Sequence, residues 1–255
     1  MRKVEVYNLI LEVTRRCNMT CRHCLRGECQ NVDMTHEIID RTFDGISSVD
    51  HITFSGGEPS MNIDAIRYTL EVVKERNISV NSFYLVTNGK VIPDGFLEVM
   101  NDWYAYCLQD AFIGREEQML SCEEVMEVQQ LLGYDDILTR CGCALSSDIY
   151  HDPIPMKNLF TLNTLPYYRT DKFVRPNTIS LINMGRAMKL TGVRKYDLDP
   201  TRFELSIEDN QVEELYINAL GQICACCDLS YDYQNVYNYG SVLGEDWTEK
   251  LEDED

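Results

Sequence analysis

Short apolar segments alternate with longer amphipathic segments over most of the chain. The short segments are typical of strands, and the longer ones repeat apolar residues at helical spacing. The expected strands are Val4–Val13, His51–Phe54, Ser79–Thr87, Thr139–Ser146 and Thr178–Asn183. The expected helices are Thr35–Val49, Asn62–Arg76, Asp94–Gln109, Arg115–Leu132 and Pro155–Leu165. Strands that alternate with helices form βαβ units, so the pattern predicts an α/β fold with a parallel sheet.

The pattern changes near residue 200. Arg202–Ile207 and Val212–Ala219 are expected to be two strands joined by a polar turn, and the end from Glu245 to Asp255 is acidic. This part of the chain is therefore predicted to be a short hairpin and tail that packs on the preceding α/β unit.

Composition and charge narrow the classes of partner. The chain has 255 residues and a net charge of −19, which disfavours binding to the phosphate backbone of nucleic acids. It contains no apolar run long enough to span a membrane, and its first residues lack the apolar region and cleavage site of a signal peptide. We therefore expect a cytoplasmic protein without a membrane segment.

The cysteines indicate a metal centre rather than disulfides, which are rare in reducing compartments. Eleven are present, and three of them, hereafter the motif cysteines, form the pattern Cys17-x3-Cys21-x2-Cys24. One interpretation is a structural zinc site that takes His23 or Cys29 as a fourth ligand. The other is a cubane iron–sulfur cluster with three cysteine ligands and one open iron. The spacing alone leaves both interpretations open.

Polar residues follow the predicted strands at the edge where α/β folds build their sites. Gly56-Gly57 allows close approach of the backbone to a ligand, and Glu58 offers a carboxylate to an ammonium group. Asn88, Ser146 and Asp148 suit hydrogen bonds to sugar hydroxyls. Taken singly, each of these segments could equally be an ordinary turn.

Together, these segments resemble the motifs of radical S-adenosylmethionine (radical SAM) enzymes. Cys17–Cys24 resembles their CxxxCxxC motif, and Thr53–Pro59 resembles their GGE motif at the end of the second strand. Val86–Gly89, Leu145–Asp148 and Met184–Ala187 are similar to segments that follow their third, fourth and fifth strands. The resemblance covers roughly residues 8–190 in the expected order.

The resemblance implies a partial (β/α)6 barrel over residues 1–200, with residues 201–255 as a cysteine-containing hairpin and tail. It implies that the motif cysteines hold a [4Fe–4S] cluster whose open iron binds S-adenosylmethionine. Gly56, Gly57 and Glu58 would hold the methionyl ammonium. The ribose contacts would come from Asn88, Ser146 and Asp148. His23 stands where the family commonly has an aromatic residue at the adenine.

Three further cysteines, hereafter the tail cysteines, are Cys224, Cys226 and Cys227. They resemble the cysteine-rich tails of radical SAM enzymes that modify peptides, where such residues bind auxiliary clusters. Adjacent strand residues point to opposite faces, so Cys226 and Cys227 are not expected to converge on one metal unless the chain turns there. We expect no second cluster. The alternatives are an auxiliary cluster that takes a ligand from elsewhere, or a thiol that reacts with substrate.

The resulting prediction is an enzyme that cleaves S-adenosylmethionine reductively and abstracts hydrogen from a substrate. Its expected partners are a low-potential electron donor and a substrate, either a peptide or protein side chain or a small molecule. An open barrel admits a large substrate, and the charge of −19 favours a cationic one. The rival interpretation is a non-catalytic iron–sulfur or zinc protein. Such a protein would have no use for Glu58, Asn88 and Ser146 at neighbouring strand ends.

Overall fold

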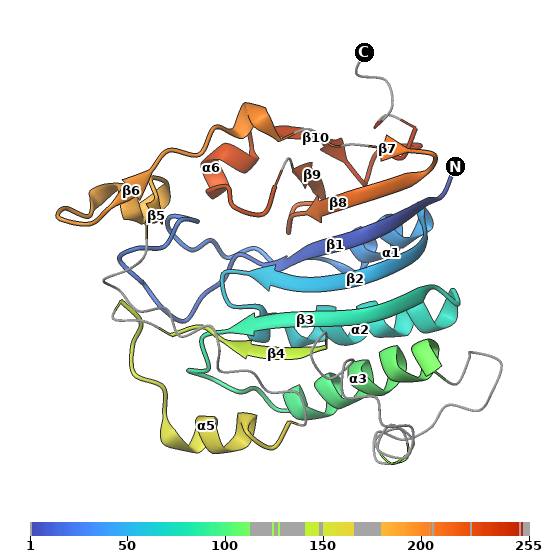
Figure 1. Ribbon diagram of the computed structural model, residues 1–255, viewed down its shortest axis with the longest axis horizontal. Coiled ribbons are helices and arrows are strands. Elements are labelled where there is room, and N and C mark those ends of the chain that lie inside the picture. Colours follow the sequence, from blue (N-terminus) through green and yellow to red (C-terminus); the bar gives the residue numbers. More distant parts are fainter. Residues whose placement is uncertain are drawn as a thin grey trace.

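A single large sheet organises the molecule. Its strands lie in the order β10-β9-β8-β1-β2-β3-β4, with β7 paired to β8. In Figure 1, helices α1, α2 and α3 lie together on one face of this sheet. The computed structural model describes residues 2–112, 124, 127, 141–147, 150–165, 180–203, 205, 207–224, 226–249 and 251. The helix expected over Arg115–Leu132 lies, apart from two residues, outside this described part.

The parallel half of the sheet follows the chain in order. Its strands are β1 (Val4–Thr14), β2 (Ile46–Gly56), β3 (Ser79–Thr87) and β4 (Gly142–Leu145). Each pairs in parallel with the next, so their carboxyl ends meet at one edge. The third strand has the bounds that the sequence predicts. The α/β class with a mainly parallel sheet is confirmed.

The connecting helices begin at polar caps. In α1 (His36–Asp44), the Thr35 side chain accepts from the Ile38 amide, as the sequence predicts. In α2 (Ile63–Glu75), the Asn62 side chain accepts from the Ala65 amide. The third helix is α3 (Phe96–Phe112). Their apolar faces pack on the sheet and leave the polar faces to water.

The first helix is shorter, and the second strand longer, than the pattern predicts. The expected helix runs to Val49, but α1 ends at Asp44 and β2 already begins at Ile46. A side chain at Gly45 would come within 2.5 Å of the Trp247 ring, so the turn requires glycine. The β-branched residues Ile46 and Val49 are buried in the sheet, a position that suits their shape better than a helix.

The core lies between the sheet and these helices. Trp103 of α3 is fully buried, and its ring centroid lies 5.3 Å from that of Phe54 and 5.9 Å from that of Phe83. Its indole nitrogen donates to the Ile66 carbonyl at 3.0 Å. Aromatic contacts of this kind, with the indole hydrogen-bonded, fix the helices against β2 and β3. The strand ends are thereby held in place.

The C-terminal part of the chain adds strands beside β1. A hairpin is present, but its first strand is not where the sequence predicts it: Arg202, expected to begin that strand, ends a turn of 3-10 helix. The two strands are β7 (Ile207–Glu208) and β8 (Gln211–Ile217), which pair antiparallel across a turn at Asp209 and Asn210. The pattern does not predict that β8 also pairs in parallel with β1. Antiparallel strands β9 (Gln222–Cys224) and β10 (Asn238–Ser241) complete this edge.

The fifth strand that the pattern predicts does not join the main sheet. Only Leu181–Ile182 is extended as β5, and it pairs with β6 (Lys195–Tyr196) in a separate two-stranded sheet. Both residues of β5 are only partly buried, unlike the core strands, and a turn at Gly185 follows. The prediction of a fifth strand in the main sheet is therefore wrong. Within the described residues, the sheet is open rather than a closed barrel, as a partial barrel allows.

The remaining elements are short. Helix α5 (Met156–Leu162) follows β4, and α6 (Tyr231–Gln234) follows β9. Three turns of 3-10 helix are η1 (Pro59–Asn62), η3 (Gly185–Lys189) and η4 (Pro200–Arg202). In the described part of the chain, no helix combines the length and the apolar character needed to cross a membrane.

Candidate functional site

A cavity of about 350 Å³ opens at the edge where the parallel strands end. It brings together the motif cysteines, the glycine-rich turn after β2, and the ends of β3 and β4. Its lining residues include Cys17, Cys21, His23, Cys24, Gly56, Gly57, Glu58, Thr87, Asn88 and Ser146, together with Arg26, His151 and Arg186. The polar residues singled out at separate strand ends in the sequence thus face one space.

The motif cysteines lie on the loop after β1, hereafter the cysteine loop (residues 15–30). All three are partly buried and have free thiols. Burial raises the pKa of Cys17, and the nearby Glu58 carboxylate raises it further. Among the described residues, no three His, Cys, Asp or Glu side chains are gathered closely enough to hold a single metal ion. A cubane does not require such a gathering, because each of its irons takes its own thiolate.

The glycine pair Gly56-Gly57 lets two backbone segments of the chain meet. The Gly57 amide donates to the Thr14 carbonyl at 2.9 Å, and the Glu58 amide donates to the Arg16 carbonyl at 2.8 Å. A Cβ on Gly56 would lie 2.4 Å from the Thr14 oxygen, and one on Gly57 would lie 2.4 Å from the Arg16 oxygen. The sequence predicts that this backbone approaches a ligand closely, and the structure shows that it closely approaches the start of the cysteine loop.

Glu58 is 1% exposed and ties the end of β2 to the end of β3. Its Oε1 accepts from the Ser60 hydroxyl at 2.6 Å and from the Thr87 hydroxyl at 2.7 Å. Its Oε2 accepts from the Asn88 amide at 2.8 Å, and the Ser60 amide adds a bond of 3.2 Å to Oε1. Burial raises the pKa of this carboxyl, while the four donors oppose that rise. Glu58 is thus rigidly placed at the cavity wall.

Asn88 and Ser146 extend the wall across β3 and β4. The Asn88 side-chain nitrogen donates to Asn18 Oδ1 at 2.8 Å, and its oxygen accepts from the Lys90 amide at 2.9 Å. The Ser146 amide donates to the Thr87 carbonyl at 2.8 Å and continues the parallel pairing beyond β4. Asn88 therefore also supports the cysteine loop, a contact that the sequence pattern does not predict.

His23 lies among aromatic residues at the mouth of the cavity. Its ring stacks on Tyr150 at 4.8 Å between centroids and meets the His151 ring edge-on at 5.2 Å. The position can therefore present a flat ring, as the predicted adenine contact requires. Asp148, also predicted to contact the ribose, lies outside the described residues.

Two arginines on the cavity wall were not singled out by the sequence reasoning. Arg186 has a side chain that is 12% exposed, and its Nε is buried without a hydrogen-bond partner. Within the described part of the chain, the ion-pair partner of its guanidinium is the exposed Glu28, at 3.4 Å from Nη1. Arg26 is the second, and its Nη1 donates to the Leu229 carbonyl at 2.7 Å. The sequence offers one indication of Arg186 as a site residue: it is a basic residue within the Met184–Ala187 motif of a strongly acidic chain.

The segment that carries Arg186 is pressed against the cysteine loop. The Arg186 amide donates to the Cys24 carbonyl at 2.9 Å. A Cβ on Gly185 would lie 2.3 Å from the Leu25 carbonyl oxygen, and the φ of +54° at Gly185 is one that glycine adopts without strain. The orphaned Nε donor fits an anionic group in the cavity, and three thiols on the same wall fit an iron–sulfur cluster. The residues present thus match the cofactors that the sequence implies.

The tail cysteines lie apart from this cavity wall. Cys224 packs with Ile10 and Tyr216, and Cys227 joins the same small apolar cluster. Cys226 packs in a different cluster, with Met184 and Leu229. Cys226 and Cys227 follow β9, which ends at Cys224, and the chain turns at Cys227. The alternation predicted for adjacent strand residues therefore does not explain why they pack in different clusters.

Comparison with known proteins finds a match to a family model over part of the chain. A family model described as the radical SAM superfamily matches residues 11–103 and confirms the resemblance over that stretch. The match also supports, at the level of the family, the predicted cofactors: a [4Fe–4S] cluster and S-adenosylmethionine. A protein of Methanocaldococcus jannaschii, named uncharacterized protein MJ0907, is 29% identical over 99 residues, 37% of this chain. The chain covers 35% of that relative's length.

Two solved structures resemble the chain at low identity. Streptococcus suis SuiB bound to precursor peptide SuiA has a TM-score of 0.46 and 13% identity, covering 99% of this chain and 65% of that one. The enzyme anSMEcpe with bound AdoMet and Cp18Cys peptide has a TM-score of 0.48 and 13% identity, covering 97% and 80%. Likenesses this distant do not bear on the substrate of this chain.

Proposed function

We propose that the protein is a radical SAM enzyme that abstracts a hydrogen atom from its substrate. The observation that carries the proposal is the single cavity that the motif cysteines share with Glu58, Asn88 and Ser146. A cluster-binding protein without catalysis needs the thiols alone. A catalyst that also binds S-adenosylmethionine needs polar groups beside them.

The motif cysteines would hold a [4Fe–4S] cluster, and S-adenosylmethionine would lie along the wall formed by the ends of β2, β3 and β4. When bound, the cluster supplies the electron and S-adenosylmethionine supplies the 5′-deoxyadenosyl radical that takes the hydrogen atom. The contacts proposed for the sugar and base are Asn88, Ser146, Asp148 and His23.

Glu58 and the glycine pair would anchor the methionyl end. Four protein donors fix the Glu58 carboxylate, so it needs no rearrangement to accept an ammonium group. Gly56 and Gly57 keep this carboxylate at a fixed place relative to the cysteine loop. Arg186, which also lines the cavity, would supply to an anionic group the Nε donor that has no partner among the described residues.

The proposed substrate is a peptide or protein side chain, and a small molecule is the second candidate. In the described part of the chain the sheet is open beyond β4, which leaves room for a large substrate. The net charge of −19 favours a cationic substrate and disfavours nucleic acid. A low-potential electron donor completes the proposed set of partners. We further propose that residues 1–200 form the catalytic unit, that residues 201–255 pack on it, and that the protein works in the cytoplasm.

The decisive experiment uses anaerobically reconstituted, dithionite-reduced protein incubated with S-adenosylmethionine. We expect 5′-deoxyadenosine from the wild type and none after Cys17→Ala, Cys21→Ala and Cys24→Ala are combined. The matched control is Cys29→Ala, because Cys29 is exposed on the same loop and is not among the cavity-lining residues.

Two outcomes would contradict the proposal. Cleavage of S-adenosylmethionine by the triple variant would remove the motif cysteines from the chemistry. A colourless wild type with one tightly bound zinc would favour the structural zinc site instead.

A further inference from the structure

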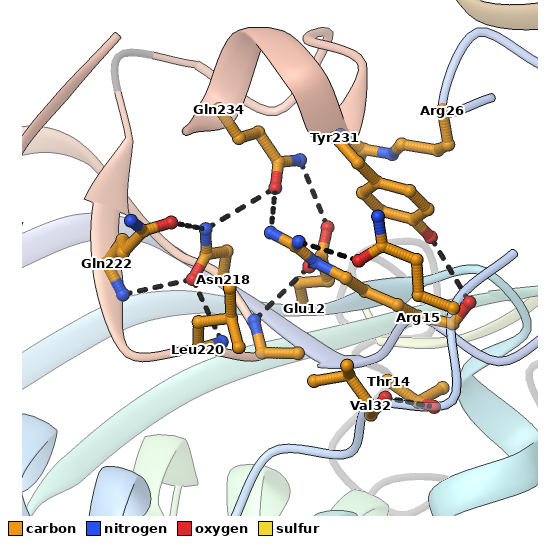
Figure 2. A network of polar contacts seen from close by, with 12 residues as sticks. Glu12, Thr14, Arg15, Arg26, Val32, Asn218, Leu220, Gln222, Tyr231 and Gln234 are labelled. Atoms are coloured by element: carbon orange, nitrogen blue, oxygen red, sulfur yellow. Dashed lines mark hydrogen bonds and ion pairs between the residues drawn. The ribbon is translucent and has the colours of Figure 1, made fainter. Parts of the chain in front are cut away.

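A buried polar network joins the start of the cysteine loop to the C-terminal part of the chain (Figure 2). Its centre is an ion pair between Glu12 and Arg15, 2.8 Å apart and 0% and 1% exposed. The Arg15 guanidinium also donates to Gln30 at 3.0 Å and to Gln234 at 2.7 Å. Arg15 is two residues before Cys17, and Gln30 ends the cysteine loop. One side chain therefore holds both ends of this loop together.

The C-terminal side of the network comes from β8, the turn after it, and α6. Gln234 Nε2 donates to Glu12 at 3.1 Å and to the Tyr216 hydroxyl at 3.0 Å. The Tyr216 hydroxyl donates to Glu12 Oε2 at 2.5 Å, and the Ala219 amide donates to Glu12 Oε1 at 3.2 Å. In Figure 2, Gln234 lies directly above the Glu12–Arg15 pair. The buried carboxylate thus depends on distant residues for most of its donors.

The same segment also holds the loop beyond the last motif cysteine. The Tyr231 amide donates to the Arg26 carbonyl at 3.2 Å, and the Arg26 guanidinium lies 5.6 Å from the centre of the Tyr216 ring. The Arg15 guanidinium lies over the Tyr231 ring at 4.6 Å. Tyr216 therefore contacts Glu12 and Arg26, and Tyr231 contacts Arg15 and Arg26. The two tyrosines together reach the chain on both sides of the motif cysteines.

We propose that Tyr216 and Gln234 are positioning residues for the metal centre, acting through Glu12, Arg15 and Arg26 on the cysteine loop. This inference rests on the proposed function, because it assumes that the loop carries the cluster. The motif cysteines lie on one loop, so their sulfur atoms keep fixed relative positions only if the backbone of that loop is fixed. The residues that fix it here lie about 200 positions away in the sequence, so part of the cluster site lies outside the cysteine motif.

The test compares two tyrosines that each lose one buried hydroxyl. Tyr216→Phe removes bonds to Glu12 and Gln234, whereas Tyr106→Phe removes bonds to the Ile78 and Val73 carbonyls on the helix-covered face. We expect Tyr216→Phe to lose iron to a chelator about 10-fold faster than the wild type, as supporting residues of metal ligands do. Tyr106→Phe should lose iron at the wild-type rate, although its melting temperature also falls.

A second measurement does not depend on the cluster. In the apo protein, the Arg15 and Gln30 amides are hydrogen-bonded within the loop region, to the Val32 and Arg15 carbonyls. Their hydrogen exchange should accelerate in Tyr216→Phe and stay unchanged in Tyr106→Phe. If Tyr216→Phe does not fold, Gln234→Met is measured in the same way. This substitution removes the hydrogen bonds of Gln234 to Glu12, Arg15 and Tyr216.

The outcomes separate the two proposals. Iron loss at the wild-type rate in Tyr216→Phe, or equal acceleration in Tyr106→Phe, would overturn the positioning role. A wild type that binds no cluster would overturn the proposed function, while faster exchange of the loop amides in Tyr216→Phe would still show that Tyr216 fixes the loop. Unchanged exchange in that apo protein would overturn the positioning role as well.

Discussion

The motif cysteines and the tail cysteines are both groups of three that lie close together in the sequence, yet the fold places them in different settings. The motif cysteines face one cavity, together with polar groups from three strand ends. The tail cysteines pack among apolar side chains and divide between two separate clusters. The spacing of cysteines in the sequence therefore indicates which thiols could bind one metal centre. The fold decides whether those thiols line the same cavity.

The thiols also differ in what surrounds them. Burial raises the pKa of Cys224 to about 12, of Cys226 to about 11 and of Cys227 to about 12, so all three are protonated at neutral pH. Metal ligation requires thiolates. Burial also raises the pKa of Cys17, so acidity alone does not distinguish the two groups. The shared cavity is the distinguishing feature.

The largest expected effect is on iron content. We expect about four irons per chain in anaerobic wild-type protein, none when all three motif cysteines become alanine, and about four when all three tail cysteines do. The brown absorbance near ~400 nm should follow the iron. About eight irons, falling to four on removal of the tail cysteines, would show that the tail group also binds a cluster.

The rate at which Cys224 is alkylated, in protein without a bound cluster, tests the surroundings described for the tail cysteines. A thiol of pKa about 12 has roughly 1000-fold less thiolate at neutral pH than a cysteine in an unfolded peptide. Cys224 is also buried, so it should be alkylated far more slowly than the exposed Cys29. Mass spectrometry after brief iodoacetamide treatment measures the order of modification. Early labelling of Cys224 would contradict its burial, and urea-unfolded protein, in which all thiols react alike, is the control.

Glu58→Gln should weaken binding of S-adenosylmethionine about 10-fold, because a charge-assisted bond becomes a neutral one. The structure adds a second expectation. The new amide group would face some of the four donors that now contact Glu58, so the free energy of unfolding should fall by about 1–3 kcal/mol. Titration calorimetry and urea unfolding measure the two effects. Unchanged affinity in a folded variant would exclude Glu58 from the binding site.

The smallest effect concerns alkaline stability. The pKa of Cys224 is raised in the folded state, so the unfolded chain releases this proton first and stability falls as the pH rises from about 9 towards 12. Between pH 9 and 11, the free energy of unfolding of Cys224→Ala should therefore fall with pH less steeply than that of the wild type. The difference between the two slopes should be about 1 kcal/mol per pH unit. Urea unfolding across this range measures the slope. Cys29→Ala should keep the wild-type slope, and equal slopes for all three proteins would contradict the burial of Cys224.

The sequence predicts the local features of the fold well. Ser79–Thr87 is a strand with the expected bounds, and Thr35 caps the first helix. Alternation and capping depend on neighbouring residues, so they can be read from a short window. The end of α1 could not be read in this way, because Gly45 is required by Trp247, a contact about 200 residues distant.

Features that depend on contacts between distant residues could not be predicted from short stretches of the sequence. The alternation in β8 fits a strand of any sheet and does not reveal that its partner is β1. The glycine pair indicates a close approach but not that the approaching group is the Thr14–Arg16 backbone. The sequence motifs name many of the residues that line the cavity. They omit Arg26 and the network through Glu12 and Arg15, which arise only when the chain is folded.

The pairing of β8 with β1 also has a consequence for the order of events during synthesis. Asn8 hydrogen-bonds to Glu214 across 206 positions, so the first strand leaves the ribosome long before the strand that covers its edge. Contacts of such long sequence separation form late. Until then, the first strand offers an unpaired edge to other chains, and the loop that follows it lacks its anchor. If the cysteine loop carries the proposed cluster, assembly of that cluster would be a late step, after translation has passed β8. Nascent chains stalled before that point should be prone to aggregate.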